Sequence, residues 1–121
     1  MGEVKFKFEN LEIWQLSMDL VKHIYILTKR FPVIEQYALT SQLRRAAISV
    51  PLNIAEGSGR KTKKDFANFL RNAIGSTLEV ITCLKIALQE KYISSEIYKD
   101  ISLKAQELYF KLIAFEKSLL R

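Results

Sequence analysis

The sequence predicts an all-α protein, a single domain (residues 1–121) folded as an antiparallel up-down-up-down four-helix bundle. Apolar residues recur at helical spacing in four long stretches, and the short connectors between them suit neighbouring antiparallel helices. The 121 residues include four Gly and two Pro, too few turn-forming residues for a many-stranded β fold. The predicted helices cover about residues 11–31, 40–57, 63–90 and 96–120, after a lead-in over residues 1–10.

The first predicted helix, residues 11–31, has Asn10 as its N-cap and ends before Pro32, which disfavours helical geometry in the preceding residue. Phe6 and Phe8 of the lead-in are candidate docking points. The helix carries two adjacent apolar stripes, a wider arc than one packed side requires. The surplus predicts either a subunit interface or deep burial within one bundle. One stripe is Leu11, Trp14, Met18, Val21 and Tyr25, and the other is Ile13, Leu20, Ile24, Leu27 and Phe31.

The second predicted helix, residues 40–57, has one apolar and one polar stripe. Pro51 lies inside it and removes a backbone hydrogen bond, but the periodicity continues in register, which predicts a kink at Pro51 and not a break. Gly57-Ser58-Gly59 should end the helix, with a glycine in the left-handed conformation. The apolar stripe is Leu39, Leu43, Ala46 or Ala47, Val50 and Ile54; the polar stripe is Gln42, Arg45, Ser49, Asn53, Glu56 and Arg60.

The last two predicted helices have recognisable N-caps. Thr62 with Asp65 resembles a capping box, and Ser94 or Ser95 caps the fourth helix. Gly75 in mid-helix costs about 1 kcal/mol relative to Ala, which predicts the close approach of a neighbouring helix there. The inward residues are Phe66, Leu70, Ala73, Thr77, Val80, Leu84 and Leu88, then Ile101, Ala105, Leu108, Leu112, Phe115 and Leu119.

The sequence offers few parts for catalysis, and we predict a non-enzymatic protein with no metal and no cofactor. His23 is expected at the surface without a Cys or carboxylate partner, and Cys83 as a small buried hydrophobe. Neither a Glu-x-x-His pair nor a Walker-type phosphate loop is present. A lone cysteine, no secretory signal and no apolar run near the ~20 residues of a membrane span predict a cytoplasmic location and no membrane partner.

Two carboxylates fall near the middle of the central helices, Glu56 and Glu79. They could form a metal site or an acid–base pair. Alternatively, they belong to a structural polar network with Asn53 and with Arg45 or Arg60. We favour the network, because arginines and amides are close in the sequence and histidines are not.

The positive charge is concentrated in one part of the chain. The net charge is +6, and the stretch from Thr40 to Gly75 holds +5 of it, from seven cations and two anions. Its densest part, residues 60–64, precedes a helix N-terminus, where the helix dipole also attracts anions. This pattern is typical of a phosphate-binding surface, although an ordinary solvated loop would also carry it. The seven candidates are Arg44, Arg45, Arg60, Lys61, Lys63, Lys64 and Arg71.

Several blocks of residues resemble a known family. Leu39-Thr40-Ser41-Gln42-Leu43-Arg44-Arg45-Ala46-Ala47 is followed by Asn53-Ile54-Ala55-Glu56-Gly57, and matching positions extend from Phe31 to Leu84, with Leu11 and Trp14 before them. Together they resemble the bacterial four-helix bundle proteins encoded in 23S ribosomal RNA intervening sequences. Three positions depart from the pattern: Ala38 replaces a usual Gly, Leu52 a small polar residue and Ile81 a Glu.

This resemblance implies a left-handed bundle that assembles into a ring, typically a homopentamer. The chain is also similar to the accessory proteins of diversity-generating retroelements, which form basic pentameric barrels and bind nucleic acid and a reverse transcriptase. Two hypotheses follow. The first is a homo-oligomer that binds RNA or DNA through the seven cations. The second is a ring-shaped scaffold that binds another protein and no nucleic acid.

Overall fold

The computed structural model describes residues 5–121 and shows an all-α fold within them. The first four residues of the predicted lead-in lie outside the described residues. In chain order, the elements are the 3-10 helix η1 (Lys7–Asn10), α1 (Glu12–Thr28), the 3-10 helix η2 (Val33–Glu35), α2 (Leu39–Ser58), α3 (Lys63–Gln89) and α4 (Ser95–Leu119). The predicted all-α bundle class is confirmed.

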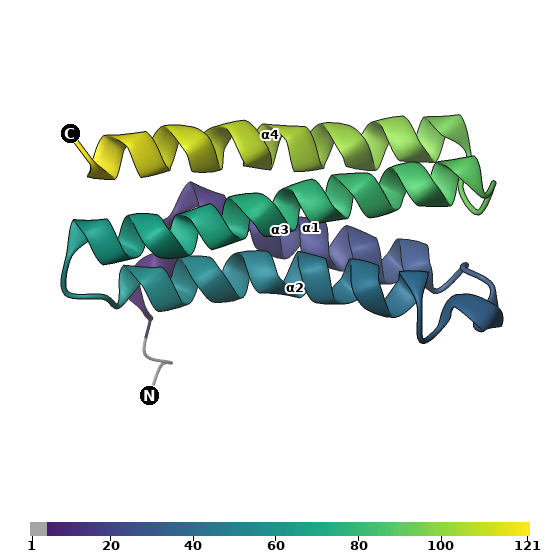
Figure 1. Cartoon of the computed structure of the whole chain (residues 1–121), viewed down its shortest axis with the longest axis horizontal. Coiled ribbons are helices and arrows are strands. Elements are labelled where there is room, and N and C mark those ends of the chain that lie inside the picture. Colours follow the sequence, from purple (N-terminus) through teal and green to yellow (C-terminus); the bar gives the residue numbers. More distant parts are fainter. Residues whose placement is uncertain (1–4) are drawn as a thin grey trace.

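The four long helices form a bundle in which α1 and α3 each pack against both α2 and α4 (Figure 1). Helices that follow one another in the chain run in opposite directions. The α2–α3 turn lies at the same end of the bundle as the N-terminal segment and the C-terminus; we call this the turn end. The connectors that follow α1 and α3, residues 29–38 and 90–94, lie at the opposite end, which we call the connector end (Figure 1).

The predicted apolar stripes build one continuous core. On α1 the second stripe is buried throughout, from Ile13 to Phe31, whereas the first stripe stays partly or largely exposed. All the apolar positions predicted for α2 are buried, with both Ala46 and Ala47 among them. α3 adds three buried residues that periodicity did not single out as inward: Ala67, Cys83 and Ala87. The surplus apolar arc of α1 is therefore a real exposed surface and not deep burial.

The helix N-caps follow the prediction at two of three sites. The Thr62 hydroxyl accepts a hydrogen bond from the Asp65 amide, and the Ser94 hydroxyl accepts one from the Ile97 amide. Asn10 is not the N-cap of α1, because η1 continues through it and Leu11 takes the N-cap position. α1 also ends earlier than predicted, at Thr28, since the chain continues as hydrogen-bonded turns before Pro32.

Two glycine predictions were wrong, the close approach at Gly75 and the left-handed glycine at the end of α2. At Gly75 the reason is that spacing does not tell which face of a helix meets a neighbour. A Cβ on Gly75 would have nothing within 4 Å, so no helix approaches closely there. The close approach is at Gly57, where a Cβ would lie 2.7 Å from Phe69 Cβ and 2.9 Å from Phe66 Cδ1 of α3. No glycine of residues 5–121 has a positive φ, and α2 ends at Gly59 with φ −87°. The left-handed residue is Lys91, with φ 63°.

α2 runs without a break through Pro51, which is itself buried. The absence of a break agrees with the sequence prediction. The bend at Pro51 and the handedness of the bundle stay predictions.

Candidate nucleic-acid interface

Four of the seven candidate cations gather at the turn end. Arg60, Lys61, Lys63 and Lys64 are all exposed and lie on the α2–α3 turn and the first turn of α3. We call these four residues the basic turn. The Arg60 guanidinium lies 4.5 Å from the centre of the Phe69 ring and 3.8 Å from the Glu56 carboxylate. Within residues 5–121, none of the three lysines forms an ion pair. Their charge is available to an external anion.

The helix that follows the basic turn adds to its positive potential. The first backbone N–H groups of an α-helix have no partner within the helix, and the aligned peptide dipoles place partial positive charge at that end. At α3, the Thr62 hydroxyl accepts from one of these groups, that of Asp65. The Asp65 carboxylate offsets part of the field, so the site is basic through the balance of four cations against Asp65 and Glu56.

Arg71 lies two turns further along α3, and its charge is already engaged. Its Nε lies 3.3 Å from Glu116 Oε2 of α4, and its Nη1 donates to Asn68 Oδ1 at 3.2 Å. Glu116 is the more buried partner, with 17% of its side chain exposed against 57% for Arg71. Arg71 is therefore near the basic turn, but it serves as a tie between α3 and α4.

Arg44 is far from the basic turn. It precedes Arg60 by more than four helical turns, which corresponds to about 24 Å along α2 at 1.5 Å per residue. Its Nε donates to the Thr28 hydroxyl at 2.8 Å, and its guanidinium lies 4.8 Å from the centre of the Tyr25 ring. These contacts hold Arg44 against the end of α1. The seven cations thus do not form one patch.

Arg45 lies on a groove that has one part formed by α2 alone and a second, polar part between α2 and α3; the three residues predicted to form a structural network line it too. Asn53 donates to the backbone and hydroxyl oxygens of Ser49, and the Ser76 hydroxyl donates to the Ser49 hydroxyl at 2.9 Å. Gln42 donates to Glu79, while Glu56 pairs with Arg60. Among the described residues, these contacts form three separate groups. Arg45 lines the groove, in two adjoining hollows of about 400 and 310 Å³.

Comparison with known proteins identifies the family of this chain and a solved structure with a similar fold. A family model described as 23S rRNA-intervening sequence protein matches residues 9–114. The chain belongs to this family. It is also similar to a solved structure, a protein of unknown function from the S23 ribosomal protein family of Bacteroides thetaiotaomicron. The two share 27% identity with a TM-score of 0.80, over 87% of this chain and 98% of the other. No curated protein matches the chain.

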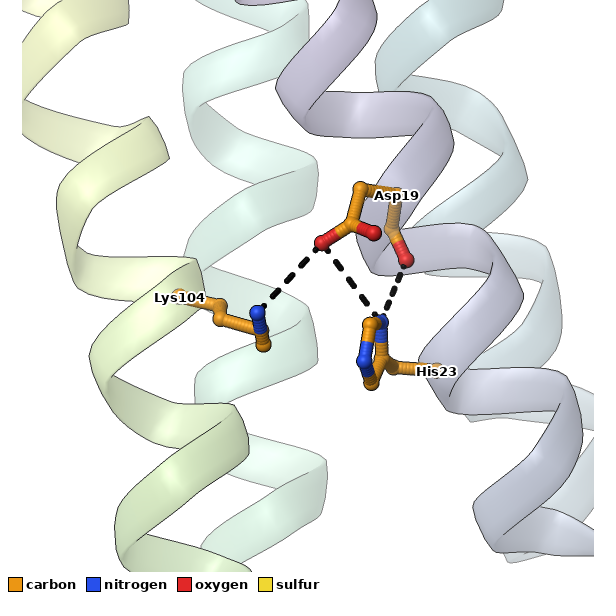
Figure 2. A network of polar contacts seen from close by, with 3 residues as sticks. All are labelled: Asp19, His23 and Lys104. Carbon is orange, nitrogen blue, oxygen red and sulfur yellow. Dashed lines mark hydrogen bonds and ion pairs between the residues drawn. The ribbon is translucent and has the colours of Figure 1, made fainter.

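The single histidine of this family member has a partner that the sequence analysis missed. Asp19 lies one helical turn before His23, and its Oδ2 is 3.5 Å from both His23 Nδ1 and Lys104 Nζ of α4 (Figure 2). His23 Nδ1 also lies 2.8 Å from the Asp19 carbonyl oxygen. The spacing of four residues could have revealed the pair. The cluster joins α1 to α4 on a partly exposed surface, and its geometry indicates a structural tie.

Cys83 is buried in this family member, as predicted. Burial raises the pKa of its thiol, and the charge of Glu79 raises that pKa further. A thiol with a raised pKa stays protonated at neutral pH and is a poor nucleophile. Within residues 5–121, no group of three or more His, Cys, Asp or Glu side chains could hold a metal ion. No helix in the same range is long and apolar enough to cross a membrane.

The structure contains two exposed apolar surfaces that the sequence analysis predicted only in part. Val33, Ile34 and Tyr37, in the connector after α1, are the most exposed large apolar side chains of residues 5–121. Between α1 and α2, an apolar groove of about 370 Å³ opens to solvent. The signal for the first surface was three large apolar residues in the ten-residue connector 29–38, too short a segment to show a period. The groove is lined by Phe8, Trp14, Met18, Val21, Ile48, Pro51, Leu52 and Ala55.

Proposed function

We propose that this member of the 23S rRNA-intervening sequence family is a non-enzymatic homo-oligomer that binds nucleic acid through the basic turn. The observation that carries the proposal is the set of four exposed cations at the N-terminus of α3, three of them without an ion pair among residues 5–121. Lys and Arg neutralise backbone phosphates and release their counterions, which makes binding depend on charge and shape. Arg71, Arg44 and Arg45 are secondary candidates for phosphate contact.

The homo-oligomer part of the proposal rests on the apolar groove between α1 and α2. Met18 and Leu52 are 44% and 61% exposed, and they continue a surface formed by Trp14 and Val21. Contiguous exposed apolar surface of this kind marks an interaction site. A ring of copies, five as the family resemblance implies, would repeat the basic turn and strengthen a weak contact through avidity. We place this assembly in the cytoplasm.

The test is fluorescence anisotropy with a labelled structured RNA and a DNA duplex across a salt series. We expect binding whose log affinity falls linearly with log salt, with a slope of roughly −0.9 per phosphate contacted on duplex DNA. Charge reversal of the basic turn (Arg60→Glu, Lys61→Glu, Lys63→Glu and Lys64→Glu) should abolish this binding.

A matched variant controls for net charge. Lys22, Lys85, Lys91 and Lys99 are also exposed, and reversing them to Glu makes the same change in total charge away from the basic turn. This control should keep most of the affinity. Equal loss in both variants would show that total charge and not the basic turn governs binding, and no binding by the natural chain at low salt would refute the nucleic-acid function.

The second candidate function is a ring-shaped scaffold that binds another protein and no nucleic acid. The exposed apolar side chains of the connector end favour it, since they offer a surface for protein contact. The absorbance ratio at 260 and 280 nm after a low-salt preparation separates the two functions. Co-purified nucleic acid raises that ratio, whereas the scaffold predicts a protein spectrum.

A further inference from the structure

The connector between α1 and α2 exposes three large apolar side chains at one end of the bundle. Val33, Ile34 and Tyr37 are 84%, 85% and 91% exposed. We call these three residues the apolar tip. Scattered apolar residues on a surface are ordinary, but three adjacent ones at this exposure form a patch that marks an interaction site.

The backbone that carries the apolar tip is anchored on both sides. Glu35, within η2, accepts hydrogen bonds from the Leu39 amide at 3.3 Å and from the Tyr92 hydroxyl at 2.8 Å. Phe31 is buried beneath the connector, with its ring 5.7 Å from that of Tyr92. The tip is therefore presented in a defined conformation, and a partner that binds it loses little conformational entropy to ordering.

The apolar groove between α1 and α2 is the matching surface on the same chain. Its volume of about 370 Å³ lies at the lower end of the ~300–1,000 Å³ range of protein pockets, enough for a few side chains. Phe8 closes one side of the groove, packed edge-on against Trp14 with ring centres 5.3 Å apart. Every residue that lines the groove is apolar, so the groove favours an occupant whose surface is largely apolar.

We propose that the apolar tip of one copy packs into the apolar groove of a second copy of this chain. This inference rests on the homo-oligomer of the proposed function and names its contact. An aromatic side chain buries ~150–250 Å², so Tyr37 with its two neighbours supplies a large share of the ~800 Å² that each partner of a standard interface buries. The charges agree as well. Exposed Lys29 and Arg30 precede the tip. Glu56 follows the groove residue Ala55; it lies 3.8 Å from Arg60 in the single chain and keeps 64% of its side chain exposed.

The contact joins two different surfaces. The tip lies at the connector end (Figure 1), whereas the groove residues lie mostly in the halves of α1 and α2 nearer the turn end, from Trp14 to Val21 and from Ile48 to Ala55. Each copy therefore gives its tip to one neighbour and its groove to another. Such a heterologous contact closes into a ring when its rotation permits, and otherwise grows as a filament.

The experiment is a complementation test by size-exclusion chromatography with light scattering. The tip variant combines Ile34→Asp and Tyr37→Asp, and the groove variant combines Met18→Asp and Leu52→Asp. All four residues are exposed in the single chain. Each variant alone should be monomeric at concentrations where the natural chain is fully assembled. An equimolar mixture should form a one-to-one dimer and stop there, because it retains one intact tip and one intact groove.

The test has one control variant, and several outcomes would contradict the tip-in-groove contact. Leu103→Asp with Phe110→Asp alters two apolar residues of α4 that are 58% and 64% exposed, and it should leave the assembly intact. A tip variant that still assembles, a mixture that stays monomeric, or a control that dissociates overturns the tip-in-groove contact. A natural chain that is monomeric refutes the homo-oligomer itself, while anisotropy reports on nucleic-acid binding separately. If an Asp variant melts early by circular dichroism, the milder Ile34→Ser with Tyr37→Ser takes its place.

Discussion

The two ends of the bundle are built in opposite ways. At the turn end, aromatic side chains of α3 pack tightly on Gly57, Arg60 lies over the Phe69 ring, and the cations of the basic turn are exposed. At the connector end, the Glu35 carboxylate binds Tyr92 and the first turn of α2, while the apolar tip lies outside. One end thus places apolar groups inside and charge outside, and the other places a polar tie beneath exposed apolar groups.

This difference indicates what each end can do. Exposed charge over an apolar support is suited to a polyanion, which binds through phosphates and needs no groove. Exposed apolar groups over a polar tie are suited to a protein surface, because burying them on contact is favourable by roughly 25 cal/mol per Å². The division assigns nucleic acid to the turn end and the inserting tip of the assembly contact to the connector end, while the groove that receives the tip lies along α1 and α2.

The largest expected effect at the turn end comes from Gly57→Ala. A Cβ there would lie 2.7 Å from Phe69 Cβ, a distance that forces α2 and α3 apart. Overpacking of this kind lowers the free energy of unfolding by about 1–3 kcal/mol. Urea denaturation monitored by circular dichroism measures it. Gly75→Ala is the control, since it has open space and should raise stability by up to ~1 kcal/mol. A neutral Gly57→Ala would show that the turn end is loosely packed.

The same glycines show which features of the fold could be predicted from the sequence and which could not. Periodicity alone predicted the four helices and most of the core, because burying an apolar stripe needs only local spacing. It assigned the close approach to Gly75 and missed Gly57, because which glycine faces a neighbour depends on how two helices are rotated about their axes. The exposed tip was missed for a related reason. Val33, Ile34 and Tyr37 lie in a connector, where no period exists to distinguish core from surface.

The cations of the candidate site could be predicted from the sequence, but which of them are free to bind a phosphate could not. The dense run of cations in residues 60–64 was visible in the chain, and it does lie together at the turn end. Whether a cation is already engaged depends on residues far away in the sequence. Arg71 is paired with Glu116, and Arg44 with Thr28, through contacts that only the packing of α3 on α4 and of α1 on α2 creates.

The next largest effect concerns the polar tie of the connector end. Glu35→Ala removes hydrogen bonds to the Leu39 amide and the Tyr92 hydroxyl, and we expect a loss of about 1–2 kcal/mol in the free energy of unfolding. Urea denaturation again measures it. Glu35→Gln is the matched control, because its amide oxygen still accepts one bond. No loss in Glu35→Ala would mean that the packing of Phe31 alone fixes the connector.

The tie also predicts a pH dependence. The hydrogen bond to Glu35 raises the pKa of Tyr92 above its usual value of 10.0. A raised folded-state pKa means that this stabilisation is fully present below pH 10 and is lost as the pH rises through the folded-state pKa. The stability difference between the natural chain and Tyr92→Phe should therefore shrink in alkaline denaturation series. A constant difference would show that the hydroxyl is not held by the carboxylate.

A smaller gain should follow from Lys91→Gly in the other connector of that end. Lys91 has φ 63°, where an L-residue is disfavoured by roughly 1–2 kcal/mol and Gly is not. Because glycine loses more conformational freedom on folding, the net gain in the free energy of unfolding should be ~1 kcal/mol or less. Thermal melts measure it, with Lys91→Ala as the control that keeps the left-handed strain. Equal melts for the two variants would show that the left-handed conformation carries no cost.

The smallest expected effect is the one that most sharpens the comparison. Ile34→Ser and Tyr37→Ser should each change the stability of the single chain by less than ~0.5 kcal/mol, because the folded monomer leaves these side chains in water. Phe31→Ala, only three residues before Ile34 but buried, should cost about 3–5 kcal/mol. Denaturation must be followed at concentrations where light scattering shows monomers, since assembly adds a concentration-dependent contribution. A large loss in Ile34→Ser under these conditions would place the tip in the core and leave the connector end with no apolar surface for a partner.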